Sequence, residues 1–284
     1  MTRIRDVERT RFRAPVKRAL IAAVALVGLA PGTAQAIYGG EEAAEPYSFM
    51  ASMQFKTSEG VQHWCGATLI APQWVVTAKH CMLYLPTAGT PLPKPSDVQV
   101  RVGSLDRTTG GDLVDVTEFV VHGKPISPDP TAPQDTRGTD IALLKLARPV
   151  SAQPVEIADS PAVTDVRLLG WGYNCQQPRG HGCTLPTALR QLDTRTLPRE
   201  GCVSAKPGDA IIADREICQA ATPSGESIRP HDSGSPMVVR AGSGWRLIGA
   251  ASGPVQQGAD TDGTGPNIYT DVTAYRSWIA EHVR

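Results

Sequence analysis

The sequence of 284 residues has no net charge, because 28 basic residues balance 28 acidic ones. Such a balance gives no indication of a nucleic-acid partner or of an anionic membrane surface. The charges are unevenly placed, however. Residues 1–36 contain seven Lys or Arg and only two acidic residues, so residues 37–284 carry 21 basic and 26 acidic side chains. The larger part of the chain is therefore mildly acidic.

Long apolar runs are absent. The longest is ALIAAVALVGLA, residues 19–30, and a membrane-spanning helix needs roughly 20 apolar residues. This run follows a basic stretch and precedes PGTAQA, whose last three residues have the small-x-small form that signal peptidase accepts. We therefore predict a secretory signal peptide over residues 1–36 and no membrane anchor in the mature form. A cut after Ala30, which would leave a six-residue propeptide, is the alternative.

The sequence also lacks CxxC pairs and paired His/Cys clusters, which argues against a zinc site. We expect neither a metal nor another cofactor. An even number of cysteines in an exported chain indicates a disulfide framework. The six are Cys65, Cys81, Cys175, Cys183, Cys202 and Cys218.

Helical periodicity is scarce, and no repeat is present at solenoid spacing. Short β-branched runs such as VQVRVG (98–103) and DIALLKL (140–146) alternate with turn-forming segments, which favours an antiparallel all-β barrel or sandwich. One amphipathic helix is expected, VTAYRSWIAEHV over 272–283. The segment 146–161 is the best candidate for a linker between two halves.

Three distant stretches carry residues suited to nucleophilic catalysis. His80 precedes Cys81 in WVVTAKHC, Asp140 opens DIALLKL, and Ser233 lies in HDSGSP. A serine hydroxyl is a weak nucleophile at neutral pH, so it needs an imidazole base, and that base needs a carboxylate to fix its tautomer. Singly, each residue could equally be structural.

As an ordered set, these stretches resemble the chymotrypsin/trypsin family of serine proteases over essentially all of residues 37–284. CGATLIAPQWVVTAKHC, TDIALLKL, GWG (170–172), DSGSP and NIYTDVTAYRSWI carry the resemblance. It implies two six-stranded antiparallel Greek-key β-barrels, about 37–155 and 156–270, and a terminal helix at about 271–283. It also implies disulfides Cys65–Cys81 and Cys202–Cys218, which leaves Cys175 and Cys183 to close a short loop.

The same resemblance implies roles for single residues. His80 would be the general base, Asp140 its carboxylate and Ser233 the nucleophile, while the backbone N–H groups of His231 and Ser233 would form the oxyanion hole. The activation pair would be the amino terminus of Ile37 and the carboxylate of Asp232. The implied substrate-binding residues are Ser227, Ser252, Gly253 and Asn267.

Several positions depart from the family pattern. His231 replaces a glycine, so its Cβ and imidazole should restrict the backbone and crowd the bound acyl group, slowing catalysis. Ser227 stands at the base of the specificity pocket and Arg229 where a cysteine is common, so no acidic group for a Lys or Arg substrate is evident. Glu226 could serve only if the loop slipped.

The sequence thus predicts a secreted, extracellular serine endopeptidase that acts on protein or peptide substrates through an acyl-enzyme. We expect a monomer without a nucleic-acid partner. The alternative from another class is a catalytically impaired protease-like domain that binds proteins or glycans.

Overall fold

The computed structural model describes most of the chain beyond residue 36. The described residues are 37–82, 92–124, 139–161, 164–175, 183–198, 202, 214–220, 222, 225–254 and 266–283. The predicted signal peptide lies outside them.

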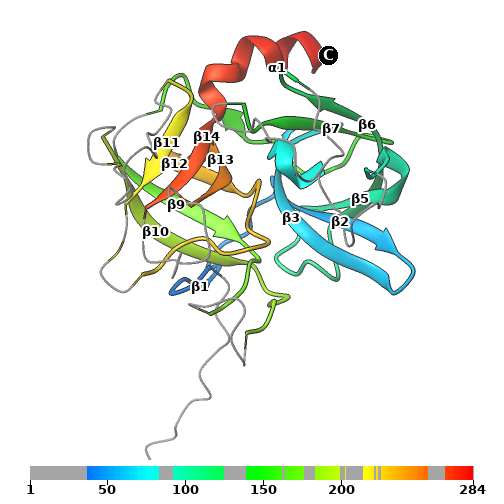
Figure 1. The fold of residues 1–284 in the computed structure, drawn as a ribbon, viewed down its shortest axis with the longest axis horizontal. Coiled ribbons are helices and arrows are strands. Elements are labelled where there is room, and N and C mark those ends of the chain that lie inside the picture. Colours follow the sequence, from blue (N-terminus) through cyan, green and yellow to red (C-terminus); the bar gives the residue numbers. More distant parts are fainter. Residues whose placement is uncertain are drawn as a thin grey trace, which may run out of the picture. The chain divides into compact units, whose positions relative to one another are not determined.

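Six antiparallel strands close the first barrel (Figure 1). Around the barrel they follow the order β2-β3-β4-β7-β6-β5. Alternation of apolar and polar residues explains strands such as VQVRV at 98–102, whose valines are buried while Gln99 and Arg101 are partly exposed. The strands are β2 (Met50–Thr57), β3 (Gly60–Ala71), β4 (Trp74–Thr77), β5 (Val98–Val102), β6 (Asp112–Val121) and β7 (Ala142–Leu146).

The second barrel is closed by pairing of β10 with both β11 and β9, which gives the ring β10-β11-β14-β13-β12-β9. Two short strands extend its sheet: β1 (Glu41–Glu42) pairs with β10, and β8 (Glu156–Ile157) lies parallel to β13. The ring strands are β9 (Asp165–Gly170), β10 (Arg190–Leu197), β11 (Glu216–Gln219), β12 (Pro236–Ala241), β13 (Gly244–Pro254) and β14 (Asn267–Asp271). The prediction of two six-stranded antiparallel barrels is confirmed.

The chain ends in a short helix, as expected, although its first turn is tighter than an α-helix. A 3₁₀ turn, η4 (Val272–Tyr275), leads into α1 (Arg276–His282). The carboxylate of Asp271 accepts a hydrogen bond from the Thr273 N–H, which caps this turn. Val272, Tyr275 and Ile279 are buried, so they tie the helix to the barrels.

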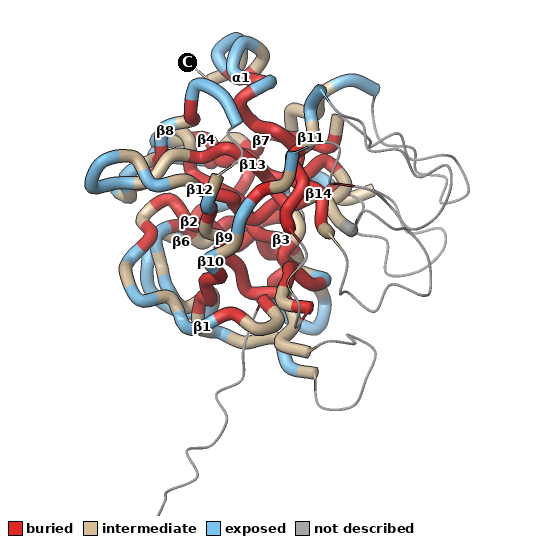
Figure 2. Tube along the Cα trace, turned by 90° about the vertical axis from the view of Figure 1, so that its left-hand side faces the viewer, coloured by how far each residue is buried: buried red, intermediate tan, exposed pale blue. Residues whose placement is uncertain are grey.

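Buried residues run along the strands, whereas the hairpins that join them are exposed (Figure 2). The segment 147–155 connects β7 to β8, and it packs against the first barrel because Val150 and Val155 donate backbone hydrogen bonds to Pro72 and Leu69. Of the described helices, none is long and apolar enough to cross a membrane.

Three disulfides reinforce the loops. They join Cys65 to Cys81, Cys175 to Cys183, and Cys202 to Cys218. Cys65 lies in β3 and Cys81 in the 3₁₀ turn η1 (Lys79–Met82), so the first bridge holds the turn that carries His80 against the barrel wall. The described residues include no free cysteine.

Candidate active site

His80 and Asp140 come together although 60 residues separate them. The turn η1 presents His80 at the end of β4, and Asp140 lies just before β7, which pairs with β4. The His80 Nδ1 is 2.7 Å from the Asp140 Oδ2, and the His80 backbone N–H donates to Oδ1 at 2.9 Å. The carboxylate therefore fixes both the ring and the backbone of His80.

The second barrel also holds Asp140. The Ser252 hydroxyl donates to Asp140 Oδ2 at 2.6 Å, and the Thr270 hydroxyl donates to the Asp140 carbonyl at 2.9 Å. Because Ser252 belongs to β13 and Thr270 to β14, the position of the carboxylate depends on contact between the barrels. Asp140 is buried, so these partners also replace lost hydration.

The charges of this pair stabilise each other. Burial alone would lower the pKa of His80, but the negative charge of Asp140 and its hydrogen bond raise that pKa above the ordinary value. For Asp140, burial alone would raise the pKa, yet the charge of His80 and hydrogen bonds from His80 and Ser252 hold it below its usual range. Asp140 can therefore stabilise an imidazolium while remaining ionised itself.

The loop that carries Ser233 is anchored to both barrels. The Ser233 carbonyl accepts a hydrogen bond from Gly66 in β3 at 2.8 Å, and the Gly234 N–H donates to Ala251 in β13 at 2.7 Å. Gly234 has a φ of 75°, and a Cβ there would lie 2.1 Å from the Thr77 hydroxyl. Only glycine fits this close approach of the loop to the first barrel.

The loop of Ser233 approaches the segment that leads to His80, because a Cβ on Gly234 would lie 2.9 Å from the Ala78 backbone nitrogen, but no hydrogen bond within the described residues joins the Ser233 hydroxyl to the His80 ring. Gly66, which bonds the Ser233 carbonyl, follows Cys65, and the sulfurs of Cys65 and Cys81 lie within 4.8 Å of a His80 ring nitrogen. Ser233 is half-buried. Hydrogen bonds of this kind are often long without a bound substrate, so the geometry is compatible with a nucleophile and base.

The backbone N–H groups of His231 and Ser233 donate to no acceptor within the described part of the chain. They are thus available to an external oxygen. His231 has a φ of 77°, a value that glycine tolerates far better than a residue with a side chain. The ring packs against Trp64 and Tyr173, and the expectation that it crowds a bound acyl group stays a prediction.

Asp232 is a fully buried carboxylate beside Ser233. It accepts hydrogen bonds from the N–H groups of Gly172 at 2.7 Å and Arg229 at 2.9 Å. Burial nevertheless raises its pKa to about 7, although these hydrogen bonds and the charge of Arg229 oppose that rise. Ile37 is also fully buried, in an apolar cluster that includes Tyr269. Burial raises the pKa of Tyr269, and the nearby negative charge of Asp232 raises it further.

The predicted specificity pocket is built around a buried arginine. Nη1 of Arg229 donates to the Ser227 hydroxyl at 3.0 Å, and Nδ2 of Asn267 donates to the same oxygen. Further bonds from Arg229 reach the carbonyls of Gly225, at 3.0 Å, and Cys175, at 3.1 Å. Arg229 therefore joins segments of the pocket at the position where the family often has a cysteine.

Two other pocket positions are also resolved. A Cβ on Gly253 would meet nothing within 4 Å, so this backbone borders open space. Glu226 packs beside Gly39, and its N–H is bonded by the Thr222 hydroxyl oxygen at 2.6 Å. The Glu226 side chain therefore lies beside Gly39, and no hydrogen bond within the described residues joins its carboxylate to the Ser227 hydroxyl.

Three potential metal donors lie together, namely Cys65, His80 and Cys81. The two cysteines form a disulfide, so their sulfurs are not available as thiolate ligands. The described residues offer no other cluster of this type.

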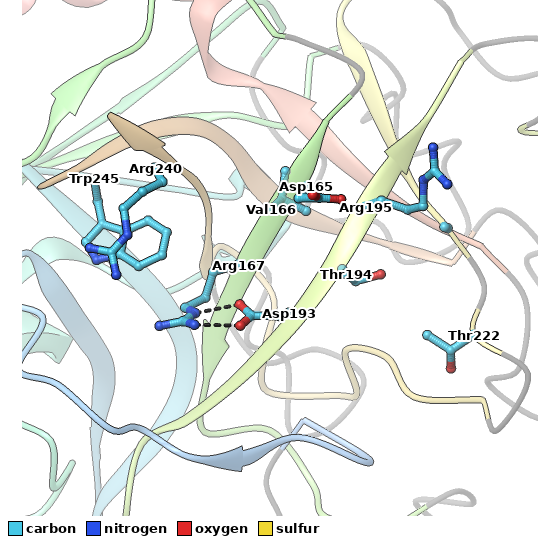
Figure 3. Close-up of a pocket in the computed structure, with 10 residues that line it drawn as sticks. Asp165, Val166, Arg167, Asp193, Thr194, Arg195, Thr222, Arg240 and Trp245 are labelled. Atoms are coloured by element: carbon cyan, nitrogen blue, oxygen red, sulfur yellow. Dashed lines mark hydrogen bonds and ion pairs between the residues drawn. The ribbon is translucent and has the colours of Figure 1, made fainter. Parts of the chain in front are cut away.

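A cavity of about 650 Å³ lies elsewhere, over β9, β10 and β12 (Figure 3). Arg167 pairs with Asp193 there at 2.6 Å, and the Arg240 guanidinium lies 4.0 Å from the centre of the Trp245 ring. None of the predicted site residues lines it. Arg167 and Asp193 are the lining residues that form an ion pair, and the described lining contains no nucleophile paired with a base.

Sequence reasoning missed several supporting residues. Lys79 is buried, and its Nζ donates to the His122 carbonyl at 3.3 Å and to the Thr139 hydroxyl at 3.1 Å, next to Asp140. A lysine within an apolar stretch beside His80 was the available signal. Thr270 gave no such signal, because its bond to Asp140 spans 130 residues.

Comparisons with known proteins agree with this geometry. The family model described as Trypsin matches residues 37–279. The chain is 30% identical over 265 residues to hypodermin-B of Hypoderma lineatum, covering 90% of this chain and 91% of that protein. It is also 30% identical over 278 residues to a tryptase of Mus musculus, covering 91% and 93%. With its two barrels and its matched length, this chain belongs to the chymotrypsin/trypsin family of serine proteases.

Proposed function

We propose that this protein is a secreted serine endopeptidase that hydrolyses peptide bonds through Ser233, His80 and Asp140. The observation that carries the proposal is the His80–Asp140 pair, in which the ring nitrogen lies 2.7 Å from a buried carboxylate. A base oriented in this way has its other nitrogen, Nε2, free to serve a nucleophile. Membership of the family supports the same assignment.

In the proposed reaction, Nε2 of His80 takes the proton of the Ser233 hydroxyl while its oxygen attacks the substrate carbonyl carbon. The N–H groups of His231 and Ser233 donate to the resulting oxyanion. His80 then protonates the leaving amine, and water releases the acyl group by the same route. Since the pKa of His80 is raised, its neutral, basic form should predominate only above an unusually high pH for a histidine.

The proposal includes activation by cleavage before Ile37. The ammonium of a new amino terminus would offset the buried charge of Asp232, a carboxylate with a pKa of about 7. If signal peptidase cuts after Ala36, export itself produces this terminus. Sequencing the amino terminus of freshly secreted protein tests the route, and a start at Pro31 would exclude it.

The proposed substrates are proteins or peptides, and we propose that the mature enzyme is an extracellular monomer. The Ser227 hydroxyl accepts hydrogen bonds from Arg229 and Asn267, and among the described residues no acidic side chain bonds it. A preference for substrates with Lys or Arg before the cleaved bond is therefore not expected.

The deciding experiment is labelling with a fluorophosphonate probe. Protein that begins at Ile37 should be modified at Ser233, whereas the Ser233→Ala and His80→Ala variants should not react. The control is Ser58→Ala, because Ser58 is exposed in the β2–β3 turn. Unmodified protein with the correct terminus would overturn the proposal and favour a non-catalytic binding domain.

A further inference from the structure

His231 adopts a backbone conformation that its residue type disfavours. Its φ is 77°, and Ile37 is the only other non-glycine residue with a positive φ within the described residues. A residue with a Cβ stays in this region only where its surroundings hold it there. Contacts hold both the side chain and the backbone carbonyl of His231.

The side chain is held by contacts with both barrels. The Nδ1 of His231 lies 3.1 Å from the Trp64 carbonyl oxygen, to which it donates. The ring makes edge contacts with Trp64, at 5.4 Å between centroids, and with Tyr173, at 5.1 Å. Trp64 belongs to β3, while Tyr173 follows β9 in the second barrel.

The backbone carbonyl of His231 is held as well. The Nε2 of His63 donates to it at 3.2 Å, and the Nδ1 of His63 lies 2.7 Å from the Ser52 hydroxyl. Because a carbonyl only accepts, the proton of His63 lies on Nε2 and Nδ1 accepts from Ser52. Burial lowers the pKa of His63 to about 3, which keeps this neutral form over the physiological range.

We propose that His231 is a positioning residue, whose ring bond to Trp64 and carbonyl bond from His63 keep its own N–H aimed at the oxyanion. The inference rests on the proposed function and goes beyond it, since it gives the imidazole a role. A glycine at this position could adopt the positive φ without any support from a side chain. The ring bond and the carbonyl bond both run to β3, to Trp64 and from His63, and together they fix the loop that precedes Ser233.

The test compares His231→Ala with His231→Asn in protein that begins at Ile37. Alanine still has a Cβ, so a positive φ remains disfavoured, but it lacks the ring that would hold this angle. Asparagine tolerates positive φ and can place an amide N–H near the Trp64 carbonyl. The probe is p-nitrophenyl acetate in pre-steady-state kinetics, which separates the acylation rate constant from the dissociation constant of the first complex.

We expect His231→Ala to lower the acylation rate constant about 10- to 100-fold, less than the roughly 10²–10³-fold cost of removing an oxyanion donor, because the N–H is misaligned and not lost. The dissociation constant should change less than twofold. Affinity for phenylboronic acid, which forms a tetrahedral adduct with a serine, should fall with the rate constant. His231→Asn should recover most of both losses.

His282→Ala is the matched control, because the Nδ1 of His282 also bonds a tryptophan carbonyl, that of Trp278, in α1. It should leave acylation unchanged. The inference is overturned if His231→Ala acylates within twofold of the parent, or if the dissociation constant rises as much as the rate constant falls. A parent protein that never reacts with the fluorophosphonate would instead contradict the proposed function.

Discussion

The two halves of the candidate site differ in how many of their polar groups find partners in protein that is not cleaved before Ile37. On the side of His80 and Asp140, three hydrogen bonds from two segments, two from His80 and one from Ser252, hold the carboxylate, and the two charged groups stabilise each other. On the side of Ser233, the neighbouring Asp232 carries a raised pKa of about 7, and His231 adopts a disfavoured angle. The candidate base is thus held by its partners, whereas the loop of the candidate nucleophile contains a buried carboxylate whose hydrogen bonds and Arg229 neighbour do not offset its burial.

This difference indicates where control can act. A half whose groups satisfy one another responds little to chain cleavage, because no partner is missing. A half with a buried carboxylate gains stability when a cation is supplied. The comparison therefore leads to separate predictions for the two sides.

The largest effect is expected on the side of the base. Asp140→Asn should lower kcat about 10⁴-fold, because an amide can donate to Nδ1 and stabilise the wrong tautomer of His80. The fold should persist, since the hydrogen-bond geometry is retained. Steady-state kinetics with a peptide ester will measure the loss, and a decrease below tenfold would contradict the assignment of Asp140.

The next largest effect is a pH-dependent change in the free energy of unfolding, caused by Asp232 in protein that is not cleaved before Ile37. The folded state binds the Asp232 proton up to pH about 7, whereas the unfolded state releases it near the ordinary value of 3.8. Stability from this group is therefore complete at low pH and decreases as the pH rises from about 4 to 7. A shift of about 3 pH units corresponds to about 4 kcal/mol.

The measurement is urea unfolding at several pH values in a Ser233→Ala background, which prevents self-digestion. The difference in free energy of unfolding between this protein and its Asp232→Asn derivative isolates the contribution of Asp232. The lowered pKa of His63 makes stability rise with pH, but it does so in both proteins and therefore cancels in the difference. Asp165→Asn, at an exposed position, serves as control. If this difference stayed constant from pH 4 to 7.5, the pKa of Asp232 would not be raised in the uncleaved protein, and the prediction would be wrong.

A smaller effect is expected from Arg229, which connects the segments of the nucleophile side. Arg229→Met removes donors from Ser227 and from the carbonyls of Gly225 and Cys175, so the free energy of unfolding should fall by about 3 kcal/mol. Arg246→Met breaks an exposed ion pair with Glu156 and should cost about 0.5 kcal/mol or less. Equal urea midpoints for the two variants would argue against this role.

The smallest effect should come from Ser252→Ala. It removes one of the hydrogen bonds to Asp140 and leaves both bonds from His80 in place. We expect kcat to fall about tenfold, in line with the loss of one hydrogen bond to a charged group. A pH profile should show the pKa of Asp140 moving upward, and an unchanged rate would show that the base side tolerates loss of its link to β13.

Much of the fold could be predicted from local patterns and from the resemblance. Alternating runs such as 98–102 became strands, and the amphipathic segment 272–283 formed the terminal helix after a 3₁₀ turn. The roles of His80, Asp140 and Ser233 stay predictions until the kinetic tests are made. The contacts of Arg229 and Thr270 could not be predicted, because their partners lie far away in the chain.

The sequence by itself determined the class of fold, since strand alternation, turn residues and the order of the motifs are local features that survive without knowledge of contacts. Only the tertiary structure decided that the His231 ring packs on Trp64 and that Arg229 holds the pocket segments together. It also decided that Asp232 is buried with a raised pKa. Hydrogen-bond direction and desolvation depend on which distant segments meet, and a linear sequence does not specify those distances.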